Sequence, residues 1–319
     1  MTLAWVLGSN GLLGTALSRA LQLNGSDLFC PAERFCWDDE PKLSTQIAAA
    51  VQAFAAQLGM SHRWEVYWAA GIGTMGSKAE AFAPETRALS LLLQCLEAVP
   101  LLTAQPGGVA FASSAGAIYA GSSDYVITEK TEPAPTTDYA REKLRQEDLV
   151  SRFAVTNSQT SALIARISTL YGPGQATGKK QGLMTHIARS ILRNQPIQIY
   201  VPYDTIRDYI TADDAAATMI AALRNIGDQP RAVTKIIASE HPVTVAEIIS
   251  IFRRVARRKP RIVTSASRLS GLYARRVQFR SVVLADQARP AMQKLAIGIA
   301  QLMAAERAAF VRGSSEEAK

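Results

Sequence analysis

Short apolar runs alternate with longer amphipathic stretches along the first half of the chain. Five runs have the length and composition of buried strands: Leu3–Leu7, Leu28–Cys30, Glu65–Ala69, Gly108–Ser113 and Ser161–Ile167. Alanine- and leucine-rich stretches with helical spacing lie between them: Gly11–Leu23, Leu43–Leu58 and Glu85–Val99. This alternation predicts an α/β fold, in which a doubly wound parallel sheet with right-handed crossovers is covered by helices on both faces.

The alternation stops after Tyr171-Gly172-Pro173-Gly174. A polar loop, Gln175–Gly182, leads into a helix and then a short strand near Ile197–Val201. Further on, Thr244-Val245-Ala246-Glu247 has the pattern of a capping box that opens a helix over Val245–Arg257. We therefore predict a first lobe of residues 1–173 with 205–238 returning to it, a smaller lobe of 174–204 and 239–312, and a frayed tail of 313–319.

A glycine-rich turn joins the first strand to the first helix. Gly8-Ser9-Asn10-Gly11-Leu12-Leu13-Gly14 has the form G-x-x-G-x-x-G, and in this context each glycine has a function. The first permits a tight turn, the second lets the backbone approach a pyrophosphate, and the third lets the helix pack closely on the strand. The N–H groups at the helix start then hold the phosphates. The alternative is a glycine turn that binds nothing.

Charged residues after the second strand bear on the identity of the dinucleotide. Glu33 lies near the distance at which such folds place an acid on the adenosine ribose, and this favours NAD. Arg34 follows at once and suits the additional phosphate of NADP, so the sequence leaves NAD and NADP both open. Asp38 is expected either to contact the adenine or to cap the next helix.

Tyr139 and Lys143 form a Y-x-x-x-K pair in a segment of helical composition, Tyr139–Val150. Residues four apart project from the same helix face. A phenol ordinarily titrates near 10, and a nearby ammonium favours the phenolate. Tyrosine can then take a proton from a carbinol while hydride leaves for a nicotinamide, or act in reverse. Lysine can also hold the nicotinamide ribose. The motif alone is common by chance.

A hydroxyl at the end of the fourth strand adds weight to that pair. Ser113 and Ser114 end an apolar run, at the edge where ligands bind open α/β sheets. We expect Ser114 to hydrogen-bond the substrate oxygen and orient the tyrosine, because it lies later in the turn. The alternative is a serine-rich loop that caps the backbone.

These features resemble the extended short-chain dehydrogenase/reductases, specifically the NAD-dependent epimerase/dehydratase group of nucleotide-sugar enzymes. The resemblance covers roughly residues 2–300. It rests on Gly8–Gly14, Ser113-Ser114 with Tyr119 downstream, Tyr139 with Lys143, Arg166-Ile167-Ser168, Tyr171–Gln175, and Arg207-Asp208-Tyr209-Ile210 before Asp213-Asp214.

The resemblance implies a Rossmann domain with a small C-terminal lobe that closes over a nucleoside-diphosphate sugar. Catalysis would rest on Ser114, Tyr139 and Lys143, and the substrate would contact Ser113, Ser114, Tyr139 and Arg207. Arg207 would bind the diphosphate, unless it forms a structural salt bridge with Asp208 or Asp214. The expected NAD or NADP contacts are Gly8, Asn10, Gly11, Leu12, Gly14, Glu33, Arg34, Asp38, Ala69, Ala70 and Lys143.

The chain also departs from that family. The stretch Ala115–Tyr119 lacks the adjacent Asp-Glu of the sugar dehydratases, which argues against 4,6-dehydratase chemistry. Where many relatives have a helical asparagine, this chain has Glu85-Thr86-Arg87. That substitution leaves open the cofactor contact or proton relay at this position.

Composition narrows the remaining possibilities. No apolar run is long enough to span a membrane, and no export signal is present, so we expect a cytoplasmic protein. Three cysteines and the scattered His62, His186 and His241 predict neither disulfides nor a metal site. The net charge is +8, concentrated between Arg253 and Arg280. That cluster either attracts an anion or forms a solvated helix face. Because few aromatic residues lie nearby, nucleic acid is not an expected partner.

The expected activity is that of an NAD(P)-dependent nucleotide-sugar epimerase or 4-ketoreductase, in a chain that relatives suggest forms a homodimer. One alternative is an extended short-chain reductase of a non-sugar carbonyl compound, against which Arg207 and the basic lobe argue. The other is a non-catalytic dinucleotide-binding relative, for which Ser114, Tyr139 and Lys143 together exceed what is needed.

Overall fold

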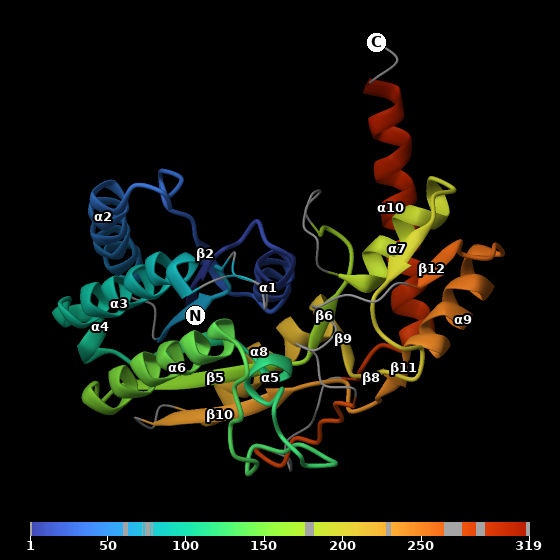
Figure 1. The fold of residues 1–319 in the computed structure, drawn as a ribbon. Helices are drawn as coiled ribbons and strands as arrows, with labels where there is room; N and C mark the ends of the chain where they lie inside the picture. Colours follow the sequence, from blue (N-terminus) through green and yellow to red (C-terminus); the bar gives the residue numbers. More distant parts are fainter. Residues whose placement is uncertain are drawn as a thin grey trace.

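The computed structural model describes residues 2–59, 63–71, 73, 77, 79–175, 182–227, 231–264, 276–284 and 291–316 of the 319-residue chain, without the side chains of 313–316. The strands are β1 (Thr2–Leu7), β2 (Asp27–Phe29), β3 (Arg63–Trp68), β4 (Gly107–Ser114), β5 (Thr160–Ile167), β6 (Thr169–Tyr171), β7 (Ile197–Ile199), β8 (Ile206–Arg207), β9 (Tyr209–Thr211), β10 (Ala232–Ile237), β11 (Val243–Thr244) and β12 (Ile262–Thr264). The helices are α1 (Leu12–Leu23), α2 (Glu40–Leu58), α3 (Ala83–Glu97), α4 (Pro100–Ala104), α5 (Ala115–Ile118), α6 (Asp138–Thr156), α7 (Leu183–Leu192), α8 (Ala212–Ile226), α9 (Val245–Ala256) and α10 (Leu295–Glu316), with a 3-10 turn at Ala79–Ala81. Figure 1 shows their arrangement.

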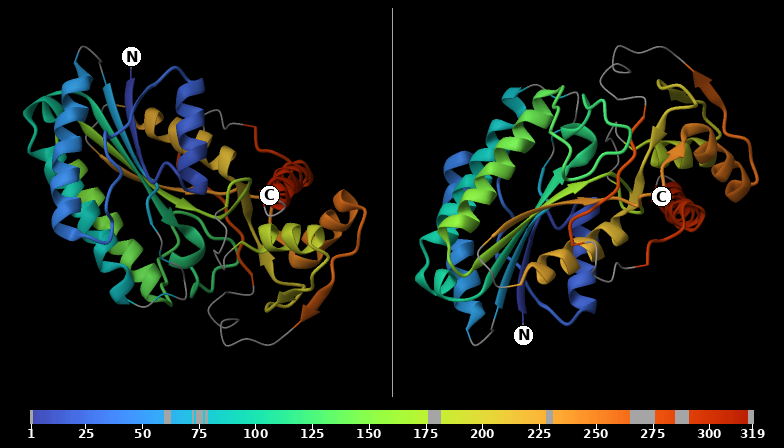
Figure 2. Two further views of the ribbon diagram at one scale, coloured as in Figure 1. Left: turned by 90° about the horizontal axis from the view of Figure 1, so that it is seen from above. Right: turned by 90° about the horizontal axis from the view of Figure 1, so that it is seen from below.

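Six parallel strands form the central sheet in the order β10-β5-β4-β3-β1-β2. All residues of β5 are buried, as expected for a strand covered on both faces. Apolar side chains of α2, α3 and α6 pack on one face around Trp5 and Phe111. Those of α1 and α8 pack on the other face around Tyr67 and Ala110. Figure 2 shows the two layers of helices on opposite faces of the sheet. The doubly wound parallel sheet of the sequence prediction is confirmed.

The strand order reverses between β1 and β3, because β2 lies on one side of β1 and β3 on the other. In open α/β sheets the crevice at the carboxyl ends of such strands is where ligands bind. Gly8 follows β1 and Ala69 follows β3, so the glycine turn lies at this position. After the chain has passed through β6 to β9, β10 returns to pair with β5 and extends the same sheet.

A second core forms away from the sheet, between α7, α9, α10 and β7. Its buried members include Ile187, Phe252 and Leu302. The capping box at Thr244 and Glu247 is present and opens α9, which ends at Ala256. Helix α10 continues to Glu316 and points away from the rest of the molecule in Figure 1, so residues 313–316 of the expected frayed tail are helical. Residues 176–181 of the expected polar loop lie outside the described residues. No described helix meets the length and hydropathy needed to cross a membrane.

Candidate functional site

The glycine turn after β1 is packed so closely that two of its glycines tolerate no side chain. Gly8 has a φ of +83°, and a Cβ built on it would lie 2.6 Å from the backbone nitrogen of Ala70. A Cβ on Gly14 would lie 2.0 Å from the carbonyl oxygen of Gly8. The turn is therefore wedged between the start of α1 and the segment that follows β3, as the sequence pattern predicts for the first and third glycines.

The start of α1 leaves its backbone donors available to an anion. Gly11 is the N-cap residue, no side chain caps the helix, and its first turn holds no acidic residue. Asn10 and Gly11 are exposed, whereas Leu12 is half-buried. The unpaired N–H groups of a twelve-residue helix favour a pyrophosphate at this position. The cradle formed by Gly8 and Gly14 thus fits the phosphates of a dinucleotide.

The Gly14→Ala variant should bind dinucleotide at least about tenfold more weakly and unfold at a lower temperature. The added methyl group would meet backbone atoms that move only with the whole turn, and overpacking of this kind destabilises by about 1–3 kcal/mol. Titration with NADPH or NADH and thermal unfolding check both effects. Gly116→Ala is the matched control, because nothing lies within 4 Å of a Cβ built on Gly116. Equal binding by the two variants would contradict the role of Gly14.

Charged residues that follow β2 lie on the surface. Glu33 accepts a hydrogen bond from Nε2 of Gln46 at 3.2 Å, and the same nitrogen donates to the carbonyl oxygen of Arg34 at 3.0 Å. The side chain of Arg34 is exposed, and none of the described carboxylates pairs with it. Asp39, not Asp38, caps α2 by accepting from the backbone N–H of Lys42. The capping alternative for Asp38 is therefore wrong, and its adenine contact stays a prediction.

Tyr139 and Lys143 lie one turn apart near the start of α6. The helix begins after Thr137, whose side chain accepts from the backbone N–H of Ala140. Nζ of Lys143 lies 5.9 Å from the ring centre of Tyr139 and 4.9 Å from that of Phe111 on β4. The half-exposed Tyr139 ring also packs against Phe82, with the ring centroids 5.6 Å apart. The expected common face of the two residues is confirmed.

A buried ion pair ties Lys143 to the neighbouring helix α3. Its Nζ donates to Oε1 of Glu85 at 2.9 Å and to Oε1 of Gln146 at 3.0 Å. Glu85 in turn touches the loop after β3, because a Cβ built on Gly71 would lie 3.0 Å from both carboxylate oxygens. Since Ala70 abuts Gly8, an unbroken series of contacts leads from the glycine turn through this loop and Glu85 to Lys143 and Tyr139.

The two serines at the end of β4 have different surroundings. The hydroxyl of Ser113 is buried and donates to Oε1 of Glu147 at 2.6 Å. Ser114 is half-exposed, and its hydroxyl makes no hydrogen bond to any of the described residues. This arrangement favours Ser114 over Ser113 as the hydroxyl that meets a substrate, in keeping with the sequence prediction. The substrate contact of Ser113 stays a prediction.

Glu147 is also the centre of a buried polar network. Arg166 of β5 donates to both of its carboxylate oxygens, at 3.0 and 2.7 Å, and to the hydroxyl oxygen of Tyr119 at 2.5 Å. The carboxylate raises the pKa of Arg166 against the opposing effect of burial. Burial raises the pKa of Tyr119, although Arg166 opposes it. The network keeps Arg166 charged and Tyr119 protonated. Its buried side chains also join β4, α5, α6 and β5 next to the end of β4.

Arg207 lies half-buried on β8, in the part of the chain where the resemblance places the diphosphate. Its Nη1 donates to the carbonyl oxygen of Ile206 at 2.9 Å. The carboxylate of Asp208 accepts from Ser168 and from Ser239, and Oδ2 of Asp214 accepts from the backbone N–H of Gln293. Asp208 and Asp214 thus also hold other parts of the fold together, and the diphosphate contact of Arg207 stays a prediction.

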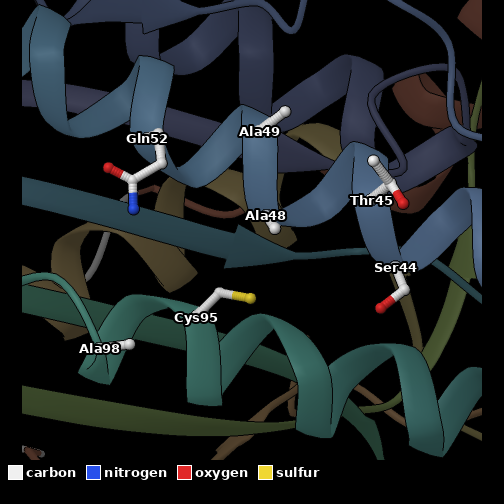
Figure 3. Close-up of a pocket in the computed structure, with 7 residues that line it drawn as sticks. All are labelled: Ser44, Thr45, Ala48, Ala49, Gln52, Cys95 and Ala98. Atoms are coloured by element: carbon white, nitrogen blue, oxygen red, sulfur yellow. The ribbon is translucent and has the colours of Figure 1, made fainter.

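An open pocket outside this site lies between α2 and α3 (Figure 3). Its lining consists of Ser44, Thr45, Ala48, Ala49, Gln52, Cys95 and Ala98, and it contains none of the expected site residues.

Within the described part of the chain, no cluster of three or more His, Cys, Asp or Glu residues is arranged to hold a metal ion. The basic residues of the cluster from Arg253 to Arg261 are exposed, at and just after the end of α9. Arg268 and Arg275 of that cluster lie outside the described residues. His62 also lies outside them.

Sequence reasoning missed the partners that hold Lys143. Gln146 lies three residues after Lys143 on the same helix, a spacing that indicates contact in any predicted helix. Glu85 was noticeable as a departure from the family pattern, but its pairing with Lys143 depends on how α3 packs on α6. Phe82, which packs on Tyr139, carried no signal at all.

Comparison with known proteins shows what this chain is similar to. Residues 4–234 match the model of the NAD dependent epimerase/dehydratase family. The chain is 31% identical over 96 residues to a dTDP-L-rhamnose 4-epimerase of Burkholderia thailandensis, which is 30% of this chain and 26% of that protein. It is also 31% identical over 121 residues to an Escherichia coli dTDP-4-dehydro-6-deoxyglucose reductase, which is 38% of each chain.

These alignments span about a quarter to two fifths of the length of the two relatives.

Among solved structures, a UDP-glucose-4-epimerase from Stenotrophomonas maltophila, with bound NAD and formylated UDP-arabinopyranose, superimposes with a TM-score of 0.80. Its sequence identity is 19%, and the match covers 98% of this chain and 99% of that one, so it shows a shared fold. Because the family model covers most of the sequence, the chain belongs to the NAD-dependent epimerase/dehydratase family.

Proposed function

We propose that this chain catalyses hydride transfer between NAD(P) and a carbinol carbon of a nucleoside-diphosphate sugar, with Tyr139 as the proton acceptor or donor. The observation that supports this most strongly is the series of contacts from the glycine turn through Gly71 and Glu85 to Lys143 and Tyr139. This series joins the glycine turn and the phenol–ammonium pair at the carboxyl edge of one sheet, where ligands bind this type of fold.

Each residue of the proposed site has a distinct task. A bound nicotinamide supplies the hydride acceptor or donor. Tyr139 exchanges the proton of the substrate hydroxyl, and its half-exposed ring leaves the phenol accessible. Lys143 favours the phenolate and offers Nζ to a ribose hydroxyl. Ser114 donates to the substrate oxygen, which holds that oxygen near the phenol.

The proposed substrate class rests on the family and on Arg207. The names of both relatives describe enzymes that act on dTDP-linked deoxysugars. Arg207 suits a diphosphate because a guanidinium offers forked donors to phosphate oxygens. The nucleoside diphosphate is therefore expected to anchor the sugar in the site and to take no part in the chemistry.

The residues after β2 favour NADP(H) over NAD(H). An NAD-selective site directs a carboxylate at the adenosine ribose, but Glu33 is already hydrogen-bonded to Gln46. Cys30, directly after the strand, offers no carboxylate to the ribose. The exposed guanidinium of Arg34 supplies the donors that a 2′-phosphate requires.

The Arg34→Ala variant should bind NADPH about ten- to a hundredfold more weakly and NADH unchanged, since charge-assisted hydrogen bonds contribute about 1.5–3 kcal/mol. Quenching of tryptophan fluorescence during titration with each coenzyme measures both affinities. Glu33→Gln serves as the control and should leave NADPH binding intact. If the unmodified protein binds NADH more tightly than NADPH, the proposed preference is wrong.

A panel of UDP-, GDP- and dTDP-linked sugars and 4-keto sugars tests the activity. Interconversion of two sugars without net coenzyme turnover identifies an epimerase, whereas stoichiometric loss of NADPH with a 4-keto sugar identifies a reductase. Sugar turnover should fall by about 10²- to 10⁴-fold in Tyr139→Phe. Retention of more than a tenth of the turnover by that variant would refute the proposed acid–base residue.

A further inference from the structure

The carboxylate of Glu85 is buried directly beside the ammonium of Lys143. The exposed fractions of the residues are 9% for Glu85, 6% for Lys143 and 1% for Gln146. The contact of 2.9 Å between Nζ and Oε1 is reinforced by Gln146, whose Oε1 accepts from Lys143 and whose Nε2 donates to Glu85 at 3.3 Å. Gln146 also donates to Thr86 at 2.9 Å, so the carboxylate and the amide hold each other in place.

This ion pair lies inside the proposed site. Glu85 abuts Gly71 of the loop beside the glycine turn, and Lys143 faces the rings of Tyr139 and Phe111. A structural salt bridge elsewhere in the protein would not alter the chemistry, but here one partner is the cation that acts on the phenol. A negative charge 2.9 Å from Nζ opposes the field that the ammonium exerts on Tyr139.

We propose that Glu85 is a positioning residue that fixes the ammonium of Lys143 and offsets its charge where it faces the Tyr139 ring. A protonated phenol donates to the oxygen of a ketone as hydride arrives at its carbon, and the proton and hydride together convert the ketone to the alcohol. The inference rests on the proposed function.

Other charged groups on the elements packed against α6 are ion-paired, hydrogen-bonded or exposed. Arg166 and Glu147 neutralise each other, and Tyr119 accepts from Arg166. Lys235 of β10 donates to Ser281, and Arg87 of α3 pairs with Glu40. The charged side chains that remain near the start of α6 are at least partly exposed: Glu80, Asp138, Arg141 and Glu142. Glu85 is therefore the buried charge whose removal acts most directly on Lys143.

The test is a spectroscopic titration of the Tyr139 phenol in the whole protein without substrate. Subtracting the tyrosinate absorbance of the corresponding Tyr139→Phe protein isolates the signal of this one residue. Glu85→Gln keeps an oxygen for Lys143 but removes the charge. We expect its titration midpoint to fall by about one pH unit, a tenfold increase in proton dissociation, because an uncompensated cation nearby favours the phenolate.

Two further variants keep the test decisive. Glu85→Asp retains the charge and should return the midpoint toward that of the unmodified protein. Glu40→Gln removes a carboxylate from the exposed pair with Arg87 and should leave the midpoint unchanged. If Glu85→Gln does not fold, Glu85→Asn removes the same charge with a shorter side chain. An unshifted midpoint in a folded, charge-neutral variant would overturn the proposal. A shifted midpoint in a protein without sugar turnover would support the electrostatic role and refute the proposed function.

Discussion

The Tyr139→Phe variant should lose about 10²- to 10⁴-fold in kcat while retaining its fold and its affinity for dinucleotide. The loss corresponds to removal of a positioned general acid–base group from the transition state. Phenylalanine keeps the aromatic packing against Phe82, 5.6 Å between centroids, and the contact with Lys143. Only the hydroxyl is removed, so lost activity with unchanged fold and coenzyme affinity is attributed to that hydroxyl.

Steady-state rates with the sugar found in the panel, together with coenzyme titration, separate these effects. Tyr203→Phe is a suitable control, because it removes the hydroxyl of an exposed tyrosine in another part of the chain. We expect KM for the coenzyme to change by less than about threefold, since the substitution leaves the ground-state binding of the coenzyme unchanged. A variant that keeps more than a tenth of the activity would show that the proton comes from another group.

The largest expected effect on stability follows from neutralising Glu147. Glu147→Gln should lower the free energy of unfolding by about 3–5 kcal/mol, because it leaves the buried guanidinium of Arg166 without its counter-charge. Both side chains of the pair are less than a tenth exposed, and the same carboxylate accepts from Ser113. The variant also weakens the hydrogen bond of the Ser113 hydroxyl, because an amide oxygen is a weaker acceptor than a carboxylate, so activity should fall together with stability.

Chemical denaturation of the two proteins measures the difference. Asp148→Asn, one residue further along α6, removes a charge from an exposed pair with Arg152 and should change stability by less than about 1 kcal/mol. Replacing both Glu147 and Arg166 by apolar residues of similar size should recover part of the loss, as buried pairs are often replaceable together. If Glu147→Gln unfolds like the unmodified protein, Arg166 is not held by this carboxylate.

The central sheet and its two helical layers were predictable because they depend on local patterns. The five predicted strands of the first lobe recur in the structure with their ends moved by at most two residues, as in Arg63–Trp68 against the expected Glu65–Ala69. Hydrophobic periodicity and the glycine turn together determine a parallel α/β order. The capping box of α9 was predictable for the same reason, since its two partners are three residues apart.

The contacts that complete the site were not predictable, because they join segments distant in the sequence. Glu85 and Lys143 are separated by 58 positions, and Ser113 and Glu147 by 34. Nothing in the pattern around Ser113 indicates that its hydroxyl points toward α6 and not toward solvent. The choice of Asp39 over Asp38 as the cap of α2 likewise depends on a single residue of register, which composition does not determine.

A crystal structure of the protein with bound NADPH tests the central claim most directly. The account predicts a pyrophosphate on the amides at the start of α1, a nicotinamide ribose within hydrogen-bond distance of Nζ of Lys143, and the Tyr139 phenol beside the nicotinamide ring. A nicotinamide that lies away from α6, with the Tyr139 hydroxyl directed out of the crevice, would contradict it.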